Sequence, residues 1–96
     1  MSALSYSIEY NVDPKTGRTL AKCLGFEFNA GRGEPLIARA GEFEAYVSRS
    51  FDPGAKGYTA SIRRLLKTTS ERVTAKEFRF EHEAIHFAAS WMKERA

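Results

Sequence analysis

The segment from Glu81 to Arg95 is the one stretch of this chain with a strong helical pattern. On a helical wheel its apolar side chains fall within an arc of roughly 200°, and an earlier start would project Glu77 into the middle of that arc. We therefore predict that the helix begins near Glu81. Acidic residues in its first turn and basic residues in its last also suit the helix dipole. The apolar side chains are Ala84, Ile85, Phe87, Ala88, Ala89, Trp91 and Met92. We expect Ile85, Trp91 and Met92 to anchor this helix in the core.

The residues before this helix predict β-strands. Residues 6–12 alternate between apolar and polar side chains, which is typical of a half-buried strand. Residues 13–17 supply a proline and a glycine for a turn, and residues 18–29 read as a second strand paired with the first. The first strand is expected to bury Tyr6, Ile8, Tyr10 and Val12. The second is expected to bury Leu20, Leu24, Phe26 and Phe28.

The middle of the chain continues the pattern. A short segment at residues 36–39 leads to a third strand at about residues 42–51, followed by a strong turn. Residues 58–69 fit either a strand or one face of a helix, and we favour the strand because such a turn usually closes a hairpin. Residues 73–80 read as a last strand. The predicted fold is α+β: an antiparallel meander of four to five strands, with one C-terminal amphipathic helix packed on the sheet, in a single domain of residues 1–96.

Composition narrows the class of protein. The chain has 96 residues, of which 43% are hydrophobic, so it can build a modest core without metal or disulfides. Its single cysteine, Cys23, suits a reducing compartment and is expected to be a small core residue. No apolar run is long enough for a membrane span, and the N-terminal residues do not resemble a signal peptide. We expect a cytoplasmic protein that needs no cofactor and contacts no membrane.

The pentapeptide His82-Glu83-Ala84-Ile85-His86 matches the pattern with which zinc hydrolases place two histidines on one helix face beside a glutamate base. His82 and His86 are the metal-ligand candidates, with Glu83 as the base. The wheel places both histidines opposite the apolar arc, and a third ligand would have to come from elsewhere in the chain. We therefore interpret the match as coincidental and predict no enzyme. A compact zinc-dependent hydrolase is the alternative hypothesis.

Positive charge is concentrated in the middle of the chain. Residues 49–79 contain eight basic and three acidic residues, whereas the segments on either side are each slightly negative. Such a block is where an anionic partner can bind. The candidate binding residues are Arg49, Lys56, Arg63, Arg64, Lys67, Arg72, Lys76 and Arg79. We expect Arg63 and Lys67 to share one strand face, with Tyr46, Phe51 and Tyr58 nearby as stacking partners for bases.

These patterns favour a small non-enzymatic binding module that contacts nucleic acid or a nucleic-acid-handling protein complex. One version of this hypothesis is a phage-type stoichiometric inhibitor or adaptor, similar in size and in its lack of catalytic residues to anti-CRISPR proteins. The partner is then either nucleic acid or an acidic surface of a protein complex. A homodimer that shares the helix or a sheet edge is a further possibility.

Overall fold

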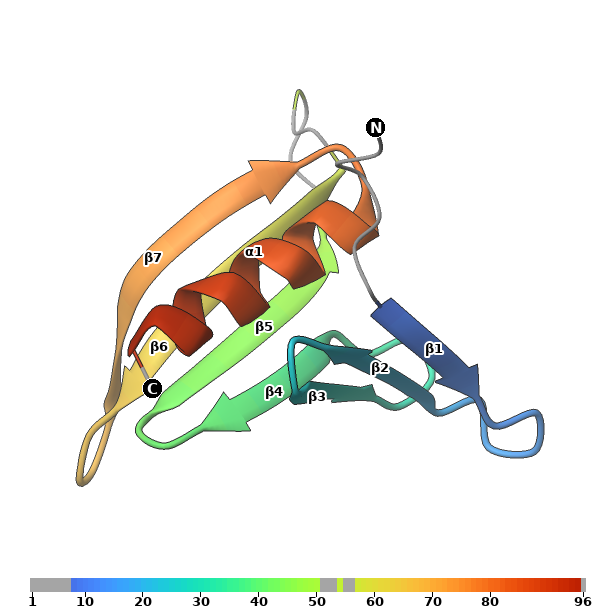
Figure 1. The fold of residues 1–96 in the computed structure, drawn as a ribbon, viewed down its shortest axis with the longest axis horizontal. Helices are drawn as coiled ribbons and strands as arrows, with labels where there is room; N and C mark the ends of the chain where they lie inside the picture. Colours follow the sequence, from blue (N-terminus) through green and yellow to red (C-terminus); the bar gives the residue numbers. More distant parts are fainter. Residues whose placement is uncertain (1–7, 51–53, 55–56, 96) are drawn as a thin grey trace.

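The computed structural model describes residues 8–50, 54 and 57–95. Within these residues, seven antiparallel strands form one sheet in the order of the chain, and a single helix packs on one face of it (Figure 1). The elements are β1 (Ile8–Val12), β2 (Thr19–Cys23), β3 (Phe26–Ala30), β4 (Leu36–Ala40), β5 (Phe43–Arg49), β6 (Tyr58–Leu65), β7 (Ser70–Phe78) and α1 (Glu81–Arg95). The predicted α+β class and antiparallel meander are confirmed. The predicted count of four to five strands is wrong.

A turn at Leu24 and Gly25 accounts for part of the difference. The expected strand at residues 18–29 is instead a hairpin of β2 and β3, with Cys23 paired to Phe26. Both turn residues have positive φ, 53° at Leu24 and 87° at Gly25, which is the backbone of a two-residue hairpin turn. Leucine is a poor residue for this conformation, so the turn carries no strong sequence signal. The short segment after the loop is also a full strand, β4.

The hairpin changes which side chains are buried. Ala21 pairs with Phe28, and both are fully buried, whereas Leu24 lies in the turn and is exposed. The predicted apolar face of residues 18–29 is therefore wrong for Leu20 and Leu24. In β1 the expected burial is present only for Ile8, which is partly buried, because Tyr10 and Val12 are about half exposed, at 48% and 56%. Tyr6 lies outside the described residues.

The helix covers β5 and β6 most closely and also reaches β7 and β2. Small side chains line this interface: Ala45 and Ala60 on the sheet and Ala88 on the helix are all 0% exposed. Alanine on both sides lets the two backbones approach closely. Ile85 and Met92 are buried as predicted. Trp91 is only partly buried, because it lies at the rim and meets the ring of Phe43 edge to face, with centroids 5.0 Å apart.

The helix begins at Glu81, as the wheel predicts. The backbone N–H groups of Glu83 and Ala84 donate to the carbonyl of Phe80, and the Glu83 carboxylate accepts a bond from the Phe80 N–H at 3.3 Å. This reciprocal arrangement satisfies donors that the first turn would otherwise leave unpaired. Within the described part of the chain, no helix is long and apolar enough to span a membrane.

The uncertain segment at residues 58–69 is a strand as far as Leu65, so the favoured interpretation is confirmed. The pairing of β6 with β7 is irregular at Ile62 and Arg63, where the register shifts by one residue. Such a bulge increases the local twist of a sheet. β3 and β4 pair at only one position, Asn29 with Ile37, and Figure 1 shows the β1–β3 part of the sheet turning away from the long strands β5–β7.

Candidate nucleic-acid interface

The basic residues of segment 49–79 that the structure describes do not gather on one face of the sheet. Arg63 and Arg64 are neighbours on β6, and their side chains therefore point to opposite faces of the sheet. Lys67, which was expected to share a face with Arg63, lies beyond β6 in the turn to β7. Arg72 pairs with Arg63 in the sheet, and Arg49 lies at the end of β5. Lys56 lies outside the described residues.

The two central arginines are already engaged within the protein. The Arg63 guanidinium donates to the Ser70 hydroxyl at 2.8 Å and to the Ser70 carbonyl at 3.3 Å. Arg64 forms ion pairs with Glu42 at 3.4 Å and with Glu71 at 3.8 Å, and it lies over the ring of Phe43. Reversing either charge would therefore disturb the sheet as well as any external contact.

The sheet face opposite the helix is electrically mixed. Arg39 forms an ion pair with Glu44 at 3.2 Å, and the Tyr46 hydroxyl donates to the same carboxylate. That hydrogen bond, with partial burial and the charge of Glu44, raises the pKa of Tyr46. Tyr46 is thus committed to Glu44, while Tyr58 pairs with Arg49 on the other side of the sheet. Tyr46 and Tyr58 therefore do not share one face of the sheet, and Phe51 lies outside the described residues.

Cations and aromatic rings do come together where β7 meets the start of α1. We call this the β7–α1 surface, and its members are Lys76, Phe78, Arg79, Phe80, His82 and Phe87. The Lys76 ammonium lies 5.6 Å from the ring centroid of Phe78 and 5.8 Å from that of Phe87. The two phenyl rings contact one another with centroids 5.3 Å apart. The strand and the helix therefore each supply one ring beneath a single ammonium group.

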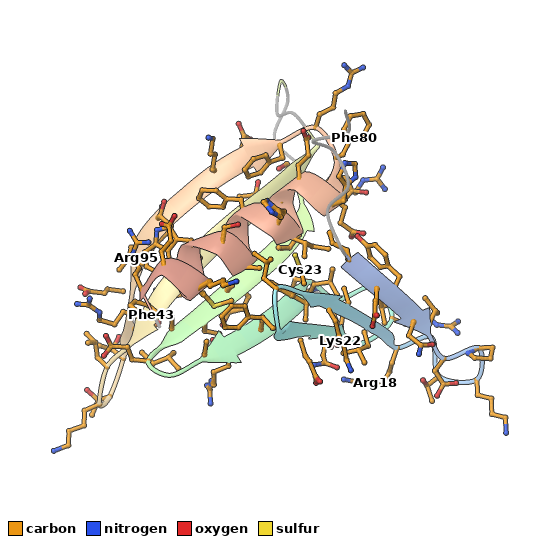
Figure 2. All side chains as sticks on the ribbon, viewed as in Figure 1. Arg18, Lys22, Cys23, Phe43, Phe80 and Arg95 are labelled. Carbon is orange, nitrogen blue, oxygen red and sulfur yellow. The ribbon has the colours of Figure 1, made fainter. Side chains whose placement is uncertain are left out.

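The second half of this surface is an exposed stack. The Arg79 guanidinium lies 5.7 Å from the ring centroid of Phe80, and the Phe80 ring stacks on the His82 imidazole at 5.6 Å with an angle of 11° between planes. Phe80 is 51% exposed, which is unusual for a phenylalanine in a small domain. Figure 2 shows Phe80 at the N-terminal end of α1, far from Arg95 at the other end.

Within the described part of the chain, no carboxylate forms an ion pair with the two cations of this surface. Lys76 and Arg79 form no ion pair with a described residue. Glu83 accepts the bond from the Phe80 backbone, and Glu77 pairs with Thr59 on the opposite face of the sheet. Both positive charges are therefore available to an external anion.

The two histidines of the HEAIH motif lie on the side of α1 away from its buried residues Ala84 and Ile85. His82 is exposed and His86 is half-buried, and the described residues hold no group of three or more His, Cys, Asp or Glu side chains that could bind one metal ion. A catalytic zinc needs three protein ligands, so the described part of the chain does not supply a zinc site. His82 instead belongs to the stack with Phe80.

A cleft of about 460 Å³ lies on the other side of the helix N-terminus, between the β3–β4 loop and the ends of β5 and β6. Its walls include Glu34, Glu81, Arg49 and Tyr58. Two carboxylates against one guanidinium make this cleft a poor site for phosphate.

The rings of the β7–α1 surface were missed by sequence reasoning. Phe78, Phe80 and Phe87 read as ordinary core residues, because aromatic side chains on strands and helices usually are. Only the cations Lys76 and Arg79 were among the predicted binding residues. Comparison with protein-family models, curated proteins and solved structures finds no match to this chain. The chain is therefore an α+β domain with cations and aromatic rings on its β7–α1 surface. Its function has to be inferred from that surface.

Proposed function

We propose that this chain is a non-enzymatic binding module whose β7–α1 surface binds single-stranded nucleic acid. The observation that carries the proposal is the exposed stack of Arg79, Phe80 and His82 beside the unpaired Lys76. Proteins that bind single strands combine rings that stack on bases with cations that contact phosphates. The stack and Lys76 supply both kinds of group within one short stretch of chain.

A single strand suits this surface better than a duplex. In a duplex the faces of the bases are stacked on one another, and only their edges are open to a protein. The Phe80 ring is 51% exposed, and an aromatic ring stacks on the face of a base only when that base is unstacked. The protein carries a net charge of +3, so we expect modest affinity and little sequence preference.

The proposal has a protein-binding counterpart. A stoichiometric inhibitor or adaptor would use the same cations against an acidic surface of a nucleic-acid-handling complex. The two versions differ in their dependence on the stack. Base binding requires a ring that can stack, whereas an acidic protein surface needs chiefly the positive charges.

Fluorescence anisotropy with labelled single-stranded DNA and RNA of mixed sequence tests the proposal. Wild-type binding should weaken as salt rises. Replacing Phe80 with alanine should weaken it by roughly 5- to 160-fold, which corresponds to the loss of one stacked base. The double variant Lys76→Ala/Arg79→Ala should flatten the slope of log affinity against log salt by about 1.4, the value for two single-strand phosphate contacts.

A matched control variant removes two positive charges from a different part of the protein surface. Lys22 and Arg39 lie in ion pairs with Glu27 and Glu44, away from the β7–α1 surface. Lys22→Ala/Arg39→Ala should leave the salt slope nearly unchanged. If neither nucleic acid binds at low salt, or if the two double variants weaken binding equally, the proposed site is wrong. Binding of an acidic protein that survives Phe80→Ala would support the protein-binding version instead.

A further inference from the structure

The sheet has two free edges, and they differ in how well they are protected. In the described part of the chain, β1 and β7 each pair with one neighbour only, and Figure 1 shows them at opposite ends of the sheet. β7 carries a register irregularity against β6 and the charged side chains Glu71, Arg72, Lys76 and Glu77. Bulges and edge charges are the features with which proteins prevent strands from pairing with other chains.

β1 has no such bulge and carries fewer charges than β7. Its pairing with β2 is regular over all five residues, and Glu9 is its only charged side chain. Tyr10 and Val12, on the helix side of the strand, are 48% and 56% exposed. An edge strand with an exposed apolar face and a free row of backbone donors and acceptors is a template for a further strand. β1 is therefore the edge that can accept a partner.

The sequence of β1 is suited to antiparallel pairing with β1 of a second copy of the chain. If two copies pair antiparallel about a two-fold axis at Tyr10, each Ile8 faces Val12 of the second copy, and each Glu9 faces Asn11 of the second copy. The apolar side chains then meet on one face, and a carboxylate meets an amide on the other. No like charges oppose one another. We propose that β1 pairs in this register with β1 of a second copy, which joins two sheets into a continuous one.

The pairing uses β1 and not β7, because these strands form opposite edges of the sheet. The dimer would present two copies of that surface, but the pairing itself does not depend on what the surface binds. Failure of nucleic-acid binding would leave the dimer proposal standing, and a monomeric protein would leave the proposed function standing.

Substitutions that change the charges at positions 9 and 11 test the proposed β1–β1 register. Both residues are exposed and lie on the face away from the helix. Asn11→Glu places a glutamate opposite each Glu9 of the dimer, which makes two like-charge pairs, and the dimer dissociation constant should rise by about tenfold. Adding Glu9→Lys creates two opposite-charge pairs and should restore dimerisation. Sedimentation equilibrium measures all three proteins, and circular dichroism verifies that each is folded. A wild-type monomer, a dimer insensitive to Asn11→Glu, or a double variant that stays dissociated would each overturn the proposal.

A cross-linking pair gives a second measurement that needs no change in charge. In a Cys23→Ala background, Tyr10→Cys places two cysteines directly opposite one another at the two-fold axis. Oxidation with diamide should then link the two copies through a disulfide, visible as a dimer band on a non-reducing gel. Val12→Cys is the matched control, because Val12 faces Ile8 rather than itself. Equal cross-linking at positions 10 and 12 would contradict the register.

Discussion

Tyr10 on β1 hydrogen-bonds the carboxylate of Glu81, the first residue of α1. This contact ties the first described strand to the last element of the fold. Partial burial, the negative charge of Glu81 and the hydrogen bond together raise the pKa of Tyr10 to about 12. The phenol proton is therefore held more tightly in the folded chain than in the unfolded one.

Stability should accordingly depend on the ionisation of Tyr10. An unfolded tyrosine has a pKa of about 10, so the stabilisation is complete below that pH and is lost as pH rises from about 10 toward 12. Tyr10→Phe cannot ionise, so the difference in unfolding free energy between wild type and variant should shrink across that window. Urea denaturation at a series of pH values measures it. A difference that does not change with pH would contradict the contact.

Leu24 lies in the left-handed region at φ 53°, and we expect its replacement by asparagine to stabilise the protein. An ordinary L-residue is strained there by about 1–2 kcal/mol, whereas Asn-Gly is favoured in this type of hairpin turn. Leu24 is exposed, so little burial is lost. Leu24→Asn should raise the unfolding free energy by about 0.5–1 kcal/mol. Leu66→Asn, at another exposed leucine without positive φ, should not.

Gly57 immediately precedes β6, and its backbone lies close to that of Arg79, the residue after β7. Its φ is 140°, and a Cβ at this position would lie 2.9 Å from the carbonyl oxygen of Arg79. Gly57→Ala should therefore destabilise the fold by about 2 kcal/mol or more, because both backbone conformation and contact are strained. Gly41 also has positive φ, but no atom lies within 4 Å of its Cβ position. Gly41→Ala should cost only about 1 kcal/mol, and comparable losses in urea denaturation would refute the close approach.

Ile85 tests the packing of the helix on the sheet. Its side chain is 0% exposed, between α1 and the sheet. Truncation to alanine should lower the unfolding free energy by about 2–5 kcal/mol through lost burial and the cavity left behind. Lys93→Ala, on the exposed side of the same helix, should change it by less than about 0.5 kcal/mol. Thermal or chemical denaturation of the pair decides whether this face of α1 is the buried one.

The candidate surface could be predicted from sequence only in part. The basic block contained Lys76 and Arg79, but it also contained Arg63 and Arg64, whose guanidinium groups are engaged with Ser70, Glu42 and Glu71. Nothing in a linear sequence distinguishes a paired arginine from an unpaired one, because the pairing carboxylates are supplied by neighbouring strands and turns. The exposure of Phe80 likewise depends on the chain leaving β7 just before the helix begins.

The amino-acid sequence alone determined the helix, its start at Glu81 and its buried face, together with the antiparallel character of the sheet. A helix is set by hydrogen bonds and side-chain spacing within a few residues, so its signal is local. Tertiary structure decided the number of strands, the burial of Ala21 rather than Leu24, and the exposure of Tyr10. Those outcomes depend on which strand lies beside which, and on how far one helix of 15 residues can reach across seven strands.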